Sequence, residues 1–108
     1  MTLTSWSAAQ MHEAIDSGDL VLVDLRADWC SQCGPQERVL ERLLPVFGEQ
    51  VRFGSVDVGE HTAVVDEYGV KGLPTLLVFR GGQHQTTLNG FKRAPEVRQA
   101  LERVLQDA

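Results

Sequence analysis

The sequence predicts an α/β fold in three layers, with a central mixed sheet of four to five strands and helices on both sheet faces. Apolar runs of strand length alternate with amphipathic segments of helical length along the chain. Residues 20–27 are apolar on both faces, as is typical of a strand in the middle of a covered sheet. The 108 residues, 43% of them hydrophobic, are enough for one core. We find no repeat or linker and expect a single domain over residues 1–108.

A capping pattern typical of a helix start, followed by an apolar run, predicts the first elements of the chain. Ser7 with Gln10 three residues later is typical of a capping box, and the helix that it starts should end at Gly18. A short leading strand could precede this helix at residues 2–4. The strand predicted over Leu20–Ala27 follows.

The middle of the chain is predicted to form a helix, a second interior strand and a crossover. Apolar residues recur at helical spacing after residue 33, namely Val39, Leu40, Leu43, Leu44 and Phe47. Pro45 should bend or end the last turn of this helix. Val51–Val58 alternates as a strand does, and His61–Tyr68 reads as a short helical or irregular crossover closed by Gly69.

The last part of the chain is predicted to form a hairpin and a helix. Thr75–Phe79 is a strand that the glycines at 81 and 82 turn into another strand near Gln85–Leu88. Pro95 is placed at a first helical position. The amphipathic helix that follows has the apolar residues Val97, Ala100, Leu101, Val104 and Leu105.

Composition and charge exclude several classes of protein. The net charge of −5, without a cluster of Lys and Arg, argues against a nucleic acid partner. The N-terminus has no secretory signal pattern, and no apolar run approaches the ~20 residues that a membrane span needs. We therefore expect a soluble, intracellular and cytoplasmic chain that acts as a monomer and binds no membrane.

The only two cysteines, Cys30 and Cys33, lie where the central strand gives way to a helix. Spacing of i, i+3 places both thiols on one helix face, close enough to form a disulfide. The helix N-terminus favours an anion at Cys30, and a thiolate is the attacking species in disulfide exchange. Cys33, one turn deeper, would be shielded and suited to resolve a mixed disulfide.

The cysteines belong to a wider set of residues that resembles the thioredoxin family. The set comprises Asp24, Ala27, Trp29, Cys30, Cys33, Tyr68, Gly69, Gly72, Leu73, Pro74, Thr75, Phe79 and Gly90. The family pattern fits without a gap from about residue 20 to residue 90. The family's Cys-Gly-Pro-Cys is replaced here by Cys-Ser-Gln-Cys, and a Gly-Pro follows the second cysteine. A register that matches Cys33-Gly-Pro-Gln to the motif is rejected, because it would break the spacing to Trp29 and Asp24.

The resemblance implies a thiol–disulfide oxidoreductase that reduces protein disulfides and contributes to cellular redox homeostasis. It makes Cys30 the nucleophile, Cys33 the resolving cysteine and Asp24 the proton acceptor that activates Cys33. It implies no bound cofactor besides the redox-active disulfide itself. NADPH would be used indirectly, through a flavin-containing thioredoxin reductase as partner.

The resemblance also implies a substrate-binding rim around the cysteines, formed by Trp29, Ser31, Gln32, Gly72, Leu73, Pro74 and Gly90. The family has a cis peptide bond before the proline, and the backbone of Leu73 would pair with an extended substrate segment. Trp29 could instead belong to the core. The freer turn at Ser31 and Gln32 should change the redox potential, in a direction that the residues leave open.

Two departures from the family pattern concern the buried acid. Arg26 stands where tryptophan is usual, and Ser55 stands where a lysine usually approaches Asp24. Our hypothesis is that Arg26 supplies the missing positive charge near Asp24 or the cysteines. The alternative is that Arg26 pairs with Asp28 at the surface.

Other functions remain open at this point. The altered dipeptide could set the potential of an oxidase or isomerase. The two thiolates could be half of a zinc or cluster site shared between chains, although no histidine lies at ligand spacing. The fold could also be a binding module with idle cysteines.

Overall fold

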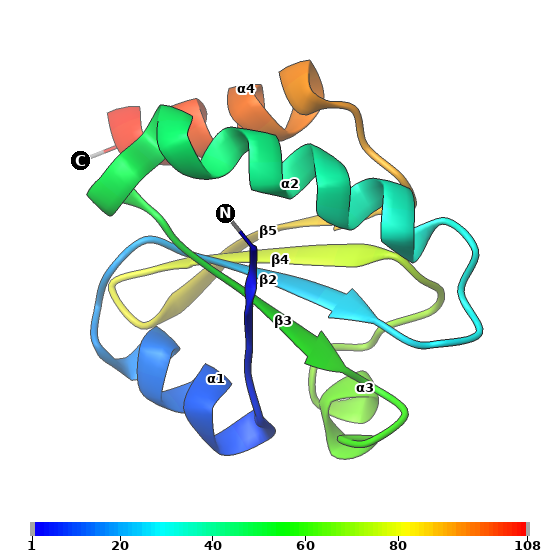
Figure 1. The fold of residues 1–108 in the computed structure, drawn as a ribbon. Coiled ribbons are helices and arrows are strands. Elements are labelled where there is room, and N and C mark those ends of the chain that lie inside the picture. The colour runs from blue at the N-terminus through cyan, green and yellow to red at the C-terminus, as the bar shows by residue number, and fades with distance from the viewer. Residues whose placement is uncertain (1, 108) are drawn as a thin grey trace.

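The computed structural model describes residues 2–107 and contains a five-stranded sheet flanked by helices (Figure 1). The elements are β1 (Thr4–Ser5), α1 (Ala8–Asp16), β2 (Val21–Arg26), α2 (Cys33–Phe47), a short 3-10 helix (Gly48–Gln50), β3 (Arg52–Asp57), α3 (Ala63–Glu67), β4 (Thr75–Arg80), β5 (Gln83–Asn89) and α4 (Ala94–Gln106).

The sheet is mixed, and its strand order is β1-β3-β2-β4-β5. The central strand β2 pairs in parallel with β3 and antiparallel with β4. β1 adds in parallel to β3, and β4 and β5 form an antiparallel hairpin. The prediction that residues 20–27 lie in the middle of the sheet is confirmed.

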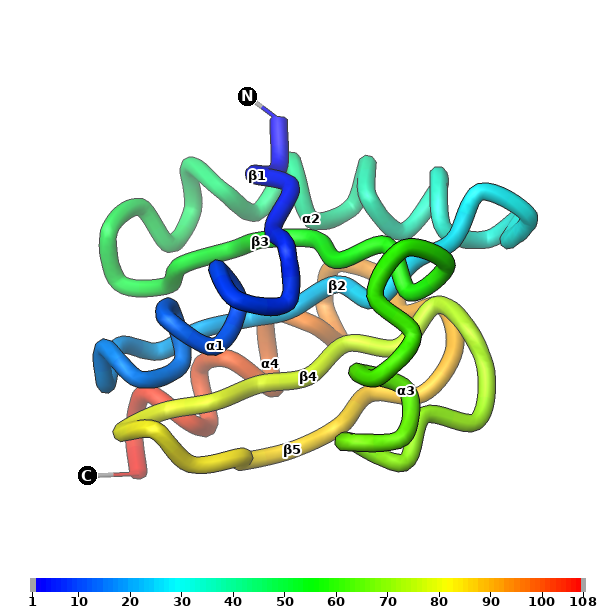
Figure 2. The backbone as a smooth tube through the Cα atoms, turned by 90° about the horizontal axis from the view of Figure 1, so that it is seen from below, coloured from blue at the N-terminus to red at the C-terminus, as the bar shows by residue number. Residues whose placement is uncertain are grey.

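The helices form the two outer layers, with α2 and α4 on one sheet face and α1 and α3 on the other (Figures 1 and 2). Each layer closes its own hydrophobic core against the sheet. Along β2, Leu22 belongs to the core under α2 and α4, and Val23 belongs to the core under α1. The pleat therefore sends Asp24 toward the layer that contains α2.

Local signals place most of the boundaries. The capping box is confirmed, because Ser7 Oγ accepts from the Gln10 amide at 3.1 Å and Gln10 Oε1 accepts from the Ser7 amide at 2.8 Å. The leading strand lies at Thr4–Ser5 rather than at residues 2–4. β5 is longer than predicted. The hairpin pairing with β4 continues on both sides of a bulge at Gln85.

Pro45 does not end α2, which continues to Phe47. A proline in the last turn removes only one backbone donor, and the Gly48 amide still closes the helix by donating a hydrogen bond to Leu44 O.

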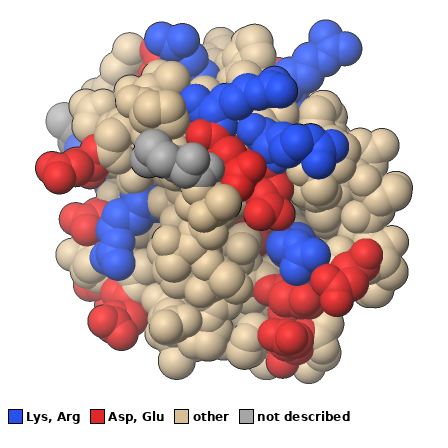
Figure 3. Space-filling view, viewed as in Figure 1, with Lys and Arg blue, Asp and Glu red and all other residues tan. Residues whose placement is uncertain are grey.

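Figure 3 shows that Lys and Arg side chains gather over α2 and α4 on the face turned to the viewer, with acidic side chains interspersed.

Candidate active site

The two cysteines lie at the start of α2, in a sequence of two backbone turns. The Cys30 amide donates to Ala27 O at 3.1 Å, and the Cys33 amide donates to Cys30 O at 3.3 Å. The expectation that both thiols lie on one helix face is wrong, because α2 begins at Cys33 and Cys30 precedes it. Pro35 has no amide proton to donate to Ser31, so the first helical bond runs from the Gln36 amide to Gln32 O at 3.1 Å.

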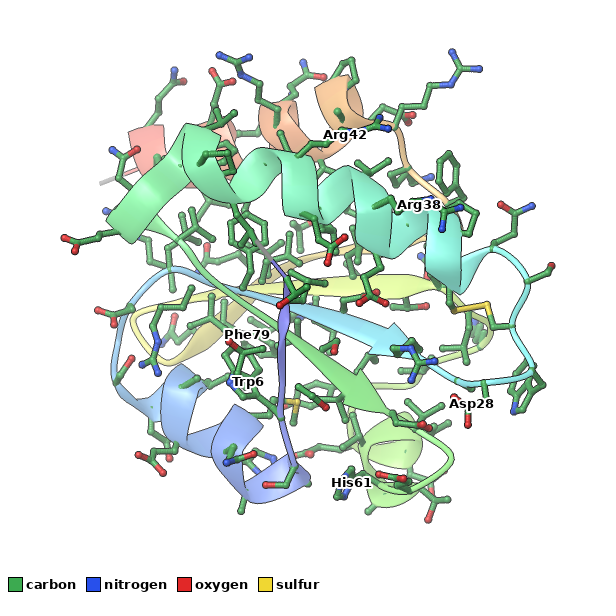
Figure 4. All side chains as sticks on the ribbon, in the orientation of Figure 1. Trp6, Asp28, Arg38, Arg42, His61 and Phe79 are labelled. Carbon is green, nitrogen blue, oxygen red and sulfur yellow. A yellow bond between two sulfur atoms is a disulfide. The ribbon has the colours of Figure 1, made fainter. Side chains whose placement is uncertain are left out.

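Cys30 and Cys33 form a disulfide, with their Cα atoms 5.5 Å apart. The sulfur–sulfur bond is visible at the N-terminal end of α2 in Figure 4. Cys30 is partly exposed, whereas Cys33 is only 1% exposed. An external sulfur can therefore approach Cys30 more readily than Cys33.

Asp24 is fully buried in the centre of β2, at 0% exposure. Its neighbours in register are Ser55 on β3 and Leu76 on β4, and neither carboxylate oxygen has a hydrogen-bond partner. The pKa of Asp24 is raised from its ordinary value of 3.8 to about 7. Burial is the main cause, the negative charge of Glu37 also raises the pKa, and the positive charge of Arg26 lowers it. A carboxyl group in this state exchanges its proton near neutral pH.

Arg26 lies at the end of β2, on the same sheet face as Asp24. Its guanidinium pairs with Asp28 at 3.0 Å and with Asp57, its neighbour in register on β3, at 3.3 Å. The hydrogen bond to Asp28 is the main cause that raises the pKa of Arg26. The pairing expected as the alternative is thus present, and Arg26 also lowers the pKa of Asp24.

Asp57 and Glu37 were missed as members of this charged group. Asp57 could have been found from the period-two spacing after Ser55, which places it on the same face as the buried acid. Glu37 has no comparable signal, because its approach to Asp24 depends on how α2 crosses the sheet.

Trp29 is 76% exposed beside Cys30, so the alternative that it belongs to the core is wrong. Trp29 borders a mainly apolar groove of about 150 Å³. The other residues that line this groove are Val58, Val65, Val70, Lys71, Gly72 and Leu73. The structure therefore brings three of the predicted rim residues together.

Gly72 and Leu73 also border a second groove, of about 500 Å³, together with Gly90. The Leu73–Pro74 peptide bond is cis, as the family resemblance implied. The Gly90 amide donates to Pro74 O at 2.9 Å, which ties the end of β5 to the start of β4.

Ser31 and Gln32 are both exposed in the turn between the cysteines. Gln32 is the residue that precedes the first turn of α2, and its side chain makes no capping bond there. The two side chains are thus free to meet a substrate or solvent.

Gln36, which sequence reasoning also missed, is a fully buried polar residue one turn after Cys33. Its signal was available, because Gln36 continues the apolar stripe of Leu40 and Leu43 at helical spacing. A polar residue on such a stripe needs buried hydrogen-bond partners.

Two features of residues 2–107 bear on the other candidate functions. No three His, Cys, Asp or Glu side chains in this range gather closely enough to hold a metal ion. In the same range, none of the helices has both the length and the apolar character required to cross a membrane.

Comparison with known proteins agrees with this geometry. The family model "Thioredoxin" matches residues 3–103. Thioredoxin from Alicyclobacillus acidocaldarius is 32% identical over 106 residues, which cover 98% of each chain. Thioredoxin from Bacillus subtilis is 37% identical over 83 residues, which cover 77% of this chain and 80% of that one.

Solved structures show the same architecture. Thioredoxin from Trypanosoma brucei brucei superposes with a TM-score of 0.87 at 25% identity, covering 98% of this chain and 93% of that chain. A mutant thioredoxin from Halobacterium salinarum gives a TM-score of 0.82 at 29% identity, covering 94% and 88%. A chain with this fold, this sequence match and a cysteine pair joined as a disulfide belongs to the thioredoxin family and is a thiol–disulfide oxidoreductase.

Proposed function

We propose that this chain reduces protein disulfides, with Cys30 as nucleophile and Cys33 as resolving cysteine. The observation that carries the proposal is the unequal exposure of the two sulfur-bearing residues, since only Cys30 is open to a large substrate. The position of Cys30 just before the N-terminus of α2 favours its thiolate form.

The reaction proceeds by two exchanges. The Cys30 thiolate attacks one sulfur of the substrate disulfide, and the other substrate sulfur leaves as a thiolate. Cys33 then attacks the sulfur of Cys30, which forms the internal disulfide and releases the second substrate thiolate. The substrate gains two electrons and this chain loses two.

Asp24 is proposed to accept the proton of Cys33 during the second exchange. A pKa of about 7 leaves Asp24 partly ionised at neutral pH, so it can take up a proton and give it back. Arg26 is proposed to provide the positive charge that the family's lysine supplies, since the neighbour of Asp24 at that position is Ser55.

The substrate is proposed to lie along the rim formed by the exposed Trp29, the dipeptide Ser31-Gln32 and the segments that contain Gly72–Pro74 and Gly90. The apolar groove beside Trp29 suits an apolar substrate side chain. The backbone of Leu73 would pair with an extended substrate strand.

Trapping experiments test these roles. Reduced Cys33→Ser should accumulate a mixed disulfide between Cys30 and a substrate that contains disulfides, such as insulin, visible by mass spectrometry. Cys30→Ser should accumulate none, although it retains one cysteine and is the matched control. Equal trapping by both variants would refute the assignment of nucleophile and resolving cysteine.

The electron source is proposed to be NADPH, through a flavin-containing thioredoxin reductase. This step would place a single-domain, monomeric chain in cytoplasmic electron transport. Coupled oxidation of NADPH in the presence of a purified reductase, this chain and insulin tests it. No NADPH oxidation above the rate without this chain would count against such a reductase.

The exposed, proline-free turn at Ser31 and Gln32 supports a potential that differs from that of the usual reductant. Equilibration with glutathione measures it. A value near the ~−270 mV of thioredoxin favours the reductant, and a value near the ~−180 mV of a disulfide isomerase favours the oxidase or isomerase alternative.

A further inference from the structure

Gln36 is a fully buried polar side chain on α2, at 0% exposure. It lies three residues after Cys33, and thus ~4.5 Å further along the helix axis. A primary amide without partners at this depth would destabilise the fold by several times the value of an ordinary hydrogen bond. The partners that it does have are therefore informative.

The side-chain amide of Gln36 makes two hydrogen bonds, both to the backbone of one distant residue. Nε2 donates to Lys92 O at 3.0 Å, and Oε1 accepts from the Lys92 amide at 2.8 Å. This reciprocal pair resembles one rung of an antiparallel ladder. It joins α2 to the segment of residues 90–93, which connects β5 to α4.

The segment is anchored a second time, two residues earlier. The Gly90 amide donates to Pro74 O at 2.9 Å. Phe91 lies between the two anchors and is 36% exposed, one of three exposed large hydrophobic residues in the described part of the chain. Because the backbone is bonded on either side of Phe91, the position from which its ring projects is held in place.

The backbone of Gln36 also contacts the turn that contains Cys30 and Cys33. Its amide makes the first helical hydrogen bond of α2, to Gln32 O between the two cysteines. One residue thus contacts the cysteine turn by its main chain and the segment of residues 90–93 by its side chain. Gln36 therefore links these two segments through hydrogen bonds.

We propose that Gln36 is a positioning residue that holds Phe91 as a contact for protein substrates with an apolar side chain near their disulfide. The proposal rests on the reduction of protein disulfides proposed above. Phe91 acts in it as a specificity-determining residue, and Gln36 acts only through Phe91. A small disulfide that reaches Cys30 alone does not need either side chain.

A double-mutant cycle tests the proposal. Gln36→Leu keeps an apolar residue of similar size on the stripe but cannot bond to Lys92, and Phe91→Ala removes the ring. Each reduced variant is mixed in single turnover with insulin and, separately, with dithiodipyridine, and the reaction is quenched with acid and analysed by mass spectrometry. Gln99→Leu, an exposed glutamine on α4, is the matched control.

We expect each single variant to react roughly fivefold to tenfold more slowly with insulin, the range of one well-placed interface side chain. The double variant should lose no more than Gln36→Leu alone, because the ring is already misplaced in that variant. All rates with dithiodipyridine should stay within twofold of the parent chain. Gln99→Leu should match the parent with both substrates.

Two results of the double-mutant cycle itself would overturn the proposal. Multiplying losses in the double variant would mean that Gln36 does not act through Phe91. Equal losses with dithiodipyridine would mean that Gln36 acts on the cysteines themselves. A parent chain that reduces dithiodipyridine but not insulin would instead refute the proposed function, so the two failures are distinguishable.

A second variant at position 36 tests the proposal if Gln36→Leu does not fold. If Gln36→Leu is unfolded by circular dichroism, Gln36→Glu replaces it, because a protonated carboxyl offers one donor and one acceptor to Lys92. Its insulin rate relative to dithiodipyridine should approach the parent value as the pH falls and the carboxyl protonates. An unchanging ratio, or an unchanged insulin rate for the exposed Phe91→Ala, would overturn the proposal.

Discussion

The buried carboxyl group of Asp24 gives the sharpest prediction for stability. Asp24→Asn keeps the shape of the side chain and removes its ability to ionise. Because neither oxygen of Asp24 has a hydrogen-bond partner, the substitution breaks no observed contact. What changes is the free energy of holding a negative charge in the layer under α2.

The magnitude follows from the pKa of Asp24. The pKa rises from 3.8 in an exposed carboxyl to about 7 in the folded chain. One pKa unit corresponds to 1.36 kcal/mol, so full ionisation should lower the free energy of unfolding by about 4 kcal/mol. Between these two pKa values the folded chain binds more protons than the unfolded chain, so its stability falls as pH rises from about 4 to above 7.

Urea unfolding of the oxidised parent and of Asp24→Asn at several pH values between 3 and 8 measures this effect. Titration of all other groups cancels in the difference between the two proteins. We expect Asp24→Asn to gain about 4 kcal/mol relative to the parent between pH 3 and pH 8. Asp16→Asn, at an exposed position at the end of α1, is the matched control and should show no such gain.

A stability difference between Asp24→Asn and the parent that stays constant within about 1 kcal/mol from pH 4 to pH 8 would show that burial does not raise the pKa of Asp24. It would also remove the support for Asp24 as a proton acceptor near neutral pH.

Three further substitutions test the packing of the fold and the charge beside Asp24. Gly54→Ala should destabilise the chain by about 1–3 kcal/mol in urea unfolding, because a Cβ there would overlap the ring of Trp6; an unchanged midpoint would contradict this. Arg26→Gln should move the pH profile of disulfide reduction to higher pH, because Arg26 lowers the pKa of Asp24; a profile identical to the parent's would end the hypothesis that Arg26 compensates for the missing lysine. Leu40→Ala, at a fully buried position of α2, should cost about 2–5 kcal/mol by thermal or urea unfolding; a loss below about 1 kcal/mol would mean that the core collapses into the space.

Much of the fold could be predicted because its signals are local. The capping box at Ser7 and the apolar run of β2 depend on residues that are close in sequence, and the structure contains both elements. The cysteine pair and the glycine and proline pattern around Pro74 likewise indicated the family. The start of α2 was the exception, since the missing amide of Pro35 moved it to Cys33.

The remaining features depend on segments that are far apart in the chain. Lys92 is 56 residues from Gln36, and Asp57 is 31 residues from Arg26. Spacing along one helix or strand indicates which face a side chain is on, but it does not identify the partner that the opposite layer supplies. For this reason the pairing of Gln36 with Lys92 could be recognised only in the structure.

The sequence by itself determined where the elements lie, that two thiols adjoin the central strand, and that one carboxyl is placed in an apolar run. These properties follow from periodicity, capping and spacing, which act over a few residues. Only the tertiary structure decided that Asp24 loses all contact with water, that Trp29 keeps it, and that the segment of residues 90–93 is held against α2. The physical reason is that desolvation and buried hydrogen bonds depend on every layer that covers a group, and those layers come from distant parts of the chain.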